Sequence, residues 1–412
     1  MSNQNLMERL LEGVEVEWKA LGEVAKIQRG ASPRPIAKYV TDDVTGIPWI
    51  KIGDTSPSLK YVSKTAQRIT PEGAKQSRIL KRGDFIMSNS MSFGRPYILD
   101  IDGAIHDGWA SISDFENKLN PDYLFHFLSS NNVQNYWISK INSGSVSNLN
   151  ADIIKSLPIP IPPLETQSEI VRILDTFTEL TAELTAELTA RKKQYTYYRN
   201  QLLTFEDGQV EWKALGEVGE LVRGNGLPKT DFTETGVPAI HYGQIYTYYG
   251  TFTTVTKSFV SPETAKKLKK VDTGDVVITN TSENLEDVGK SVVYLGEIQA
   301  VTGGHATIFK PSKNILGKYF AYFTQTSMFA DKKKKYAKGT KVIDVSATDM
   351  GKLQIPIPPL AEQARIVAIL DKFDALTNSI TEGLPREIEL RQKQYEYYRE
   401  MLMSFPKAEV EA

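Results

Sequence analysis

The chain has 412 residues, 41% hydrophobic and 24% charged, so it is long enough to fold around more than one core. It contains no cysteine, which excludes disulfides, thiolate metal ligands and cysteine nucleophiles and fits a reducing cytoplasm, the location we expect. The sequence has no apolar run of about 18 residues, so a membrane span is not expected. Because the net charge is −1, any nucleic-acid binding must depend on local basic patches.

Internal repeats divide the chain into two copies of one unit of roughly 200 residues. A helical segment over residues 1–16 is followed by the first repeated motif. The repeated motifs are VEWKALGEV at Val16 and Val210, IPIPPL at Ile159 and Ile355, and RKKQYTYYRNQLLTF at Arg191, which matches RQKQYEYYREMLMSF at Arg391. The offset rises along the chain from 194 to 196 and then 200. We therefore expect two similar units related by a pseudo-twofold axis.

Residues 25–155 form the first variable module, which shares little with its counterpart at 219–351. The runs IPWIKIG (47–53) and GDFIMS (83–88) are β-branched or aromatic and bounded by glycine, which predicts strands. Asn120-Pro121-Asp122 predicts the start of a helix over PDYLFHFLSSNNVQNYWISK, because asparagine caps a helix and proline suits its first turn. The loop SGSVSNLN (143–150) follows and offers amides and hydroxyls suited to phosphates, although an ordinary turn is an almost equal alternative.

The central segment predicts one long helix. Its apolar residues recur three or four apart at Ile170, Leu174, Phe177, Leu180, Leu184 and Leu188, after prolines 162 and 163. A helix from about Leu164 to Phe205 would span about 60 Å. Within it Thr181–Leu184 and Thr185–Leu188 are identical Thr-Ala-Glu-Leu tetrads. A tetrad can be added or lost while the apolar stripe is kept, so this segment is a candidate spacer.

The second module and the C-terminal segment repeat this pattern. GDVVITN (274–280) and KSVVYLG (290–296) predict strands, GKYFAYFTQTSMFADKKKKY (317–336) a helix, and KGTKVIDVS (338–346) the loop after it. The second apolar stripe contains Ile366, Leu370, Phe373, Leu376, Ile380, Leu384 and Ile388, after prolines 358 and 359. Two similar stripes in one chain favour two long antiparallel helices packed on each other, a coiled coil, over helices packed only on their own domains.

Candidate nucleic-acid contacts are basic, polar and aromatic side chains in both modules, because such side chains reach phosphates and base edges. In the first module they are Arg29, Lys51, Asn89, Ser90, Arg95, His106, Ser145, Ser147 and Asn148. In the second they are Arg223, Lys229, His241, Gln244, Tyr246, Asn280, His305, Lys332, Lys333, Lys334, Lys335, Lys338 and Lys341. The lysine run alone would indicate a solvated face, but with Lys338 and Lys341 it predicts one positive patch.

Catalytic motifs are missing from the sequence. The four histidines have no ligand spacing and no cysteine partners, and no catalytic residue or metal site is expected. Gly289-Lys290-Ser291 resembles the end of a phosphate-binding loop, but Asn284 stands where the first glycine belongs.

Two diverged modules, each followed by IPIPPL, a downstream glutamine (Gln167, Gln363) and a long helix, resemble the specificity subunits of type I restriction–modification systems. The motif QYxYYR at Gln194–Arg199 and Gln394–Arg399 adds to this resemblance, and the tetrads resemble a type IC subfamily. The resemblance implies an α+β chain of five parts: the helical segment 1–16, recognition domain 17–158, central helix 159–209, recognition domain 210–354, and C-terminal helix and tail 355–412.

The same resemblance implies a non-catalytic subunit. Each recognition domain would read one half of a bipartite site in double-stranded DNA, and the helices would set the spacing. Two modification subunits would carry S-adenosylmethionine, and restriction subunits would carry ATP and magnesium; this chain would hold no cofactor. Part of the tyrosine surface at Tyr195, Tyr197, Tyr198, Tyr395, Tyr397 and Tyr398 would dock the modification subunits, although packing on the recognition domains is as good an expectation for any one of them. The alternatives are a protein-bridging adaptor without DNA binding and a stand-alone nucleic-acid enzyme.

Overall fold

The computed structural model describes residues 9–10, 12–56, 59–89, 94–142, 149–206, 208–379 and 381–406. The predicted N-terminal helical segment lies mostly outside these residues. The chain divides into two compact units: unit 1 contains 1–182 and 390–412, and unit 2 contains 183–389. Each predicted helical segment therefore contributes to both units. No helix in the described ranges is long and apolar enough to cross a membrane.

Unit 1 contains two five-stranded sheets and one strand pair. The first sheet has the order β2 (Lys26–Arg29), β11 (Trp109–Ser113), β8 (Phe85–Ser88), β9 (Pro96–Leu99), β5 (Tyr61–Val62). The second has the order β3 (Val40–Thr41), β6 (Gln67–Ile69), β4 (Ile47–Ile50), β10 (Gly103–Ile105), β7 (Arg78–Leu80). The pair β1 (Glu17–Ala20) and β12 (Pro158–Ile161) joins the repeated VEWKALGEV motif to IPIPPL.

Most helices of unit 1 pack on the first sheet, whereas α3 packs on the second. They are α2 (Leu21–Val24), α3 (Pro71–Ala74), α4 (Pro121–Leu128), α5 (Asn131–Asn142), α6 (Ala151–Lys155) and the first half of α7 (Leu164–Leu202). Asn120 caps α4 as predicted, since its side chain accepts from the amides of Asp122 and Tyr123. The main core contains Phe85, Ile112 and Trp137 from this layer and Ile170 from α7.

Unit 2 repeats these sheets strand for strand. The first has the order β14 (Gly219–Arg223), β24 (Ala306–Pro311), β20 (Val276–Thr279), β22 (Ser291–Tyr294), β17 (Phe252–Thr253). The second has the order β15 (Phe232–Thr233), β18 (Ser258–Val260), β16 (Val237–Ile240), β23 (Ala300–Thr302), β19 (Lys269–Val271). Two pairs complete the unit: β13 (Glu211–Ala214) with β26 (Gln354–Ile357), and β21 (Thr281–Ser282) with β25 (Ile343–Asp344). The predicted two-copy α+β architecture is confirmed.

The helices of unit 2 are the second half of α7, α8 (Tyr242–Thr247), α9 (Pro262–Lys267), α10 (Gly317–Phe323), α11 (Ser327–Lys334), α12 (Ala347–Gly351), α13 (Leu360–Asn378) and the start of α14 (Gly383–Leu402). Each helix predicted after the sheets is divided in two, into α4 and α5 in unit 1 and α10 and α11 in unit 2. The reason is a hydroxyl: Ser130 accepts from the amide of Val133, and Thr326 accepts from the amide of Phe329, so each starts a new helix.

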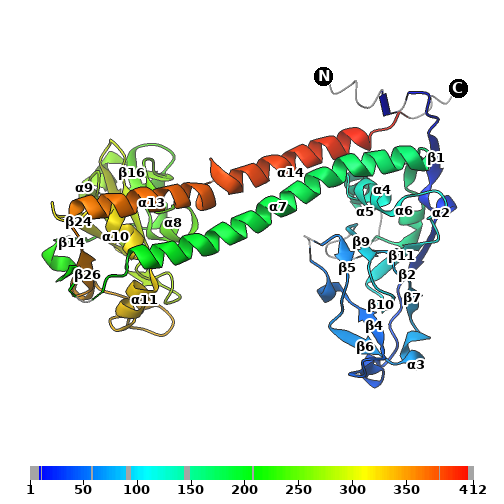
Figure 1. The fold of residues 1–412 in the computed structure, drawn as a ribbon, viewed down its shortest axis with the longest axis horizontal. Helices are drawn as coiled ribbons and strands as arrows, with labels where there is room; N and C mark the ends of the chain where they lie inside the picture. Colours follow the sequence, from blue (N-terminus) through cyan, green and yellow to red (C-terminus); the bar gives the residue numbers. More distant parts are fainter. Residues whose placement is uncertain are drawn as a thin grey trace. The chain divides into compact units, whose positions relative to one another are not determined.

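The two long helical segments differ in continuity. α7 is one helix of 39 residues, whereas the second segment, predicted to be continuous, is split into α13 and α14 (Figure 1). Ser379 accepts from the amides of Thr381 and Glu382 in a local turn. Pro385 cannot donate to a carbonyl four residues earlier, and Gly383 has a φ of 75°, so a single helix cannot pass through this point.

The predicted apolar stripes are confirmed within each unit. Their residues are buried or half-buried, except Ile380, which lies outside the described residues. In unit 1 Phe177 of α7 stacks on Tyr398 of α14, with ring centres 5.0 Å apart. In unit 2 Tyr195 of α7 stacks on Phe373 of α13 at 6.0 Å. The first half of α7 thus packs on the last helix, and its second half on α13, as expected for antiparallel helices.

Candidate nucleic-acid interface

Three predicted contacts of the first module, Arg29, Asn89 and His106, converge on Asp107 in the turn after β10. The backbone carbonyl of Asp107 accepts from Arg29 Nε and Asn89 Nδ2, both at 3.2 Å. Its carboxylate accepts from Ser32 Oγ at 3.0 Å and pairs with Arg34 at 3.5 Å. Burial alone would raise the pKa of this carboxyl, but Ser32, His106 and the two arginines hold it below its usual value. The result is a small exposed surface of arginines around one acid, which sequence reasoning missed because Asp107 is an ordinary turn residue by composition.

The other candidates of the first module are spread out. Lys51 Nζ donates to Gln67 Oε1 at 2.8 Å on the second sheet. Arg95 lines a cavity of unit 1 together with His126 of the module and Tyr395 of α14. Ser90, Ser145, Ser147 and Asn148 lie outside the described residues. Leu149, a described residue, donates its amide to the carbonyl of Asn89.

In the second module two candidate histidines contact one tyrosine. The ring of Tyr242 lies 4.5 Å from the ring of His241 and 4.9 Å from that of His305. His305 Nδ1 shares a hydrogen bond of 3.0 Å with Thr281 Oγ1, and Tyr246 donates to the Thr281 carbonyl. Tyr242 and Thr281 were not among the sequence candidates, although Tyr242 directly follows one of them.

The loop after α11 lies beside this aromatic group. β25 in that loop pairs with β21, so Ile343–Asp344 lie against Thr281–Ser282. Arg223 pairs with Asp344 at 3.7 Å, and the Lys338 amide and carbonyl bond to the backbone of Asp344. Lys229 and Lys341 are exposed. Unit 2 therefore brings Arg223, His241, Tyr246, His305 and this loop to one region.

Two predicted contacts are buried structural residues instead. Asn280 is fully buried; its Nδ2 donates to the Val345 carbonyl and its Oδ1 accepts from Thr307. Lys333 is 5% exposed, and its Nζ donates to the carbonyls of Glu286 and Val288 at 2.9 and 2.7 Å. Burial lowers the pKa of Lys333 to about 8. Their polar atoms are satisfied inside the fold, which corrects the prediction for both.

The lysine run is therefore not one surface. Lys332 Nζ lies 3.8 Å from the centre of the Trp212 ring and donates to the Gln354 carbonyl. Lys334 pairs with Asp331 at 2.9 Å. Lys334 and Lys335 are exposed, so within the run they remain the candidates for phosphate contacts.

Gln244 also has internal partners. Its Nε2 donates to Ser258 Oγ at 2.5 Å, and its Oε1 accepts from the amide of His241. Its amide group therefore supports the backbone next to His241 rather than extending outward.

Each unit fixes its module to its long helices through a buried glutamine. In unit 1 Gln167 Oε1 accepts from the Asn120 amide at 2.8 Å, and Nε2 donates to two backbone carbonyls. Gln363 makes the same three bonds in unit 2, to Leu316, Asn314 and Pro358. Both glutamines are fully buried. The glutamine after IPIPPL is therefore a structural joint between module and scaffold.

In unit 1 a second contact across this joint involves a histidine. Buried His126 on α4 lies 3.0 Å from Asp175 of α7 through Nε2 and 2.9 Å from the Tyr395 hydroxyl through Nδ1. Burial lowers the pKa of His126, so the ring is neutral, donates to Asp175 and accepts from Tyr395. Lys60 also pairs with Asp175 at 3.4 Å.

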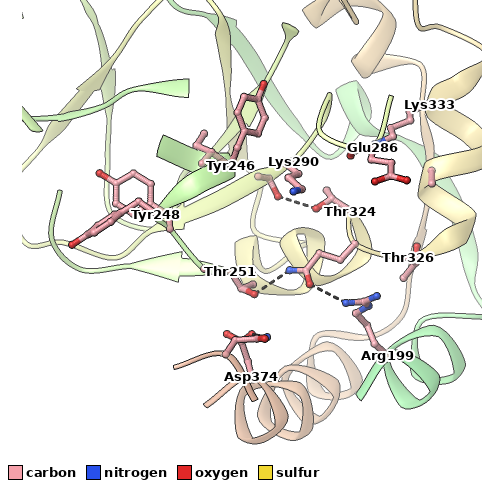
Figure 2. A pocket seen from close by; sticks show the side chains of 17 residues that line it. Arg199, Tyr246, Tyr248, Thr251, Glu286, Lys290, Thr324, Thr326, Lys333 and Asp374 are labelled. Atoms are coloured by element: carbon pink, nitrogen blue, oxygen red, sulfur yellow. Dashed lines mark hydrogen bonds between the residues drawn. The ribbon is translucent and has the colours of Figure 1, made fainter. Parts of the chain in front are cut away.

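In unit 2 Tyr322 takes the place of this histidine and donates to Asp371 at 2.7 Å. The buried Tyr195 hydroxyl has no hydrogen-bond partner among the described residues. Unit 2 also contains a cavity of about 560 Å³, whose lining includes Arg199, Thr251 and Asp374 (Figure 2). Arg199 donates to Gln325, which donates to Thr251, across this cavity, with Asp374 below them. Burial raises the pKa of Asp374.

The six tyrosines predicted to form a docking surface separate into two groups. Tyr195 is 4% exposed, Tyr395 bonds to His126 and Tyr398 stacks on Phe177, so these three face their own unit. Tyr197 and Tyr397 are 62% and 52% exposed and stand at equivalent positions of the repeat, and Tyr198 is 38% exposed. The exposed tyrosines remain candidates for docking. No cluster of three or more metal-binding side chains is found in the part of the chain that the structure describes.

Comparison with known proteins identifies relatives along nearly the whole chain. The family model for the type I restriction modification DNA specificity domain matches residues 13–191 and 209–390. A similar curated protein is the EcoR124I/EcoR124II specificity subunit of Escherichia coli, a type I restriction enzyme subunit, at 37% identity over 99% of both chains. A chain from a solved type I restriction–modification assembly shares the fold with a TM-score of 0.65 at 19% identity, covering 94% of this chain and 97% of its own. The HsdS subunit of Thermoanaerobacter tengcongensis, at 18% identity over 94% and 96%, gives 0.50.

Proposed function

Because this chain belongs to the type I restriction–modification DNA-specificity family, we propose that unit 1 and unit 2 each read one half of a bipartite DNA site. The protein is a DNA-recognition subunit, and catalysis lies in the methyltransferase and restriction subunits with which its family assembles. The observation that supports recognition of a two-part site is the repeat of the sheets. The two modules have the same topology but carry different side chains on equivalent strands.

Binding to phosphates would come from the exposed cations of each module. Arg29 and Arg34 supply them beside Asp107, and Arg223, Lys335 and Lys341 supply them in unit 2. Such local groups of cations are needed because the chain as a whole has a net charge of −1 and therefore no overall positive field.

A mobility-shift assay of this chain with its modification subunits tests the function. Specific duplex should bind, and log affinity should fall linearly with log salt concentration, by about 0.9 for each phosphate contacted. Exchanging residues 25–155 for another module should then change one half of the recognised site. A protein-bridging adaptor would give no shift with any duplex, and an exchange that altered both halves would contradict independent reading.

We further propose that Tyr197 and Tyr397 dock two copies of the modification subunit. Each borders a shallow surface depression, with Thr204 at the first and the equivalent Ser404 at the second. Equivalent surfaces on two similar units suit two copies of one partner. Replacing either tyrosine by alanine should remove about one bound copy from the purified complex. Unchanged stoichiometry in both variants would refute this docking site.

For the spacing, we propose that the two tetrads in α7 set the distance between the half-sites. All of Thr181–Leu188 is helical, and the Thr181 hydroxyl bonds back to the Phe177 carbonyl within the helix. Deleting Thr185–Leu188 shortens α7 by about 6 Å, against about 3.4 Å of DNA per base pair. Since the helix need not follow the DNA axis, we expect the gap to shorten by about one base pair with both half-sites unchanged. Sequencing of methylated DNA decides this, and altered half-sites would show that α7 is not the spacer.

A further inference from the structure

The same turn follows a central strand in both modules. β4 and β16 pair in parallel with β10 and β23, through Ile50 to Ile105 and Ile240 to Thr302. In unit 1 the next residue, Lys51, donates its amide to Asp54 at 2.8 Å. In unit 2 the next residue, His241, donates its amide to Gln244 at 3.4 Å. Lys51 and His241 therefore occupy one position of the shared frame, and Ile52 and Tyr242 occupy the next.

The neighbouring strand confirms this equivalence. β6 pairs with β4 through Trp49 and Gln67, and β18 pairs with β16 through Ala239 and Ser258. Gln67 then accepts from the Lys51 side chain, whereas Ser258 accepts from the Gln244 side chain. The backbone is held alike in both units, while the side chains of the two positions after the strand differ in charge, shape and hydrogen bonding.

At His241 the hydrogen bonds fix which nitrogen carries a proton. Nδ1 accepts from the amide of Gly243 at 3.2 Å, so in the neutral ring the proton is on Nε2. Burial, and after it Lys229 and His305, lower the pKa of His241, which keeps the ring neutral at pH 7. No described residue accepts from Nε2. His241 thus presents one hydrogen-bond donor, Nε2–H, in a fixed orientation. Base edges in the major groove offer acceptors for such a donor at purine N7, guanine O6 and thymine O4.

Tyr242 and His305 extend this group. The Tyr242 ring contacts both imidazoles, and His305 uses Nδ1 to bond Thr281, so its Nε2 also lacks a partner among the described residues. In unit 1 the same two positions present the Lys51 ammonium, a donor suited to guanine, and Ile52, which is 43% exposed and suits a thymine methyl.

We propose that the two residues directly after β4 and β16 are specificity-determining: Lys51 and Ile52 in unit 1, and His241 and Tyr242 in unit 2, assisted by His305. The proposal rests on the proposed function and assigns base contacts within it. Exposed arginines and lysines around these positions would bind phosphates without sequence preference.

The test measures affinities of the complex for duplexes that carry each single base-pair change in either half-site. For His241→Ala we expect cognate affinity to fall about tenfold to a hundredfold, with discrimination lost at one base pair of one half-site. Lys51→Ala should do the same in the other half-site. The slope of log affinity against log salt should stay unchanged for His241→Ala, because a neutral base contact releases no counterion.

Lys313→Ala is the matched control, because Lys313 is an exposed lysine outside both positions. It should leave discrimination unchanged at every base pair. Retained discrimination in the unaltered half-site shows that each variant is folded and still binds DNA.

Three results would overturn the assignment. The first is an equal loss of affinity for all duplexes with a flatter dependence of log affinity on log salt, which indicates a phosphate contact. The second is a loss of discrimination in the same half-site for both variants. The third is unchanged discrimination at every base pair. If the wild-type complex itself showed no preference for specific duplex, the proposed function would fail rather than this assignment alone.

Discussion

The two units build the same joint between module and long helices but fill it with different side chains. A buried glutamine makes three equivalent bonds in both. Beside it, His126 in unit 1 joins Asp175 and Tyr395 in one chain of hydrogen bonds, whereas in unit 2 Tyr322 bonds Asp371 and leaves the Tyr195 hydroxyl without a described partner. The backbone-directed contacts are thus shared by both copies, while the contacts between side chains have diverged.

The largest expected effect tests the shared part. Gln167→Leu and Gln363→Leu should each reduce the free energy of local opening by about 3 kcal/mol, because each leaves three backbone groups unpaired. Hydrogen exchange at α4 and at α10 measures the two losses separately. Ser168→Ala, which removes an exposed bond within α7, is the control. Unequal losses would show that the two joints are not equivalent.

The next prediction separates the units. His126→Phe should cost unit 1 about 2 kcal/mol at pH 7.5, because it leaves Tyr395 unpaired and removes one partner of Asp175. Burial places the folded-state pKa of His126 below the unfolded value of about 6.5, so the unfolded chain binds more protons as the pH falls. The stability from the neutral ring is complete above about pH 6.5 and is lost below it.

Hydrogen exchange between pH 7 and 5 measures that acid loss. We expect the opening free energy of α4 to fall more than that of α10, because Tyr322 does not titrate in this range. His126→Phe should abolish the difference. An equal acid response of α4 and α10 in the wild type would contradict the assignment to His126.

A smaller contrast concerns the tyrosines. Tyr395→Phe should cost about 1 kcal/mol, the usual value of a buried hydrogen bond, whereas Tyr195→Phe should change stability by less than about 0.5 kcal/mol. The same exchange measurement, at α14 and at the end of α7, distinguishes them. A cost at Tyr195 equal to that at Tyr395 would mean that its hydroxyl has a partner in solution.

The smallest expected effect concerns DNA affinity. Lys333→Met should leave the salt slope of binding unchanged, because this ammonium is bonded inside the fold. Lys335→Ala should make the slope shallower by about 0.9 if the exposed end of the run contacts one phosphate. A shallower slope in the Lys333 variant would show that the lysine leaves its buried site on binding.

Lys333 also shows where sequence reasoning was insufficient. At the repeat offset of 196 it corresponds to Trp137, a fully buried residue of unit 1. Trp137 lies against Gly94 and Lys333 against Gly289, and these glycines have φ values of 80° and 81°. Aligning the two copies residue by residue would have placed this lysine in the core, although composition alone indicated a charged face.

The repeats, the helix caps and the apolar stripes were predictable because each depends on residues close together in the sequence. The capping of α4 by Asn120 and the start of α7 after two prolines are examples. The convergence on Asp107 and the contacts of Tyr242 depend on strand order, which local patterns do not contain. The break before α14 was missed because Leu384 and Ile388 continue the apolar spacing, although Gly383 and Pro385 signalled it.

Because of that break, the two long helical segments differ in their number of residues but not in their number of helical residues. The second segment exceeds the first by four residues, since the repeat offset rises from 196 to 200, and four residues, 379–382, lie between α13 and α14. With 19 and 20 residues, α13 and α14 together equal the 39 of α7. The four extra residues of the second segment therefore add no helical length, because the same number of residues lies between its two helices. Adding or removing a tetrad in α7 would therefore change the length of that helix and leave α13 and α14 unchanged. Because a tetrad is close to one helical turn, α7 is the helix whose length can be adjusted in steps of about one turn.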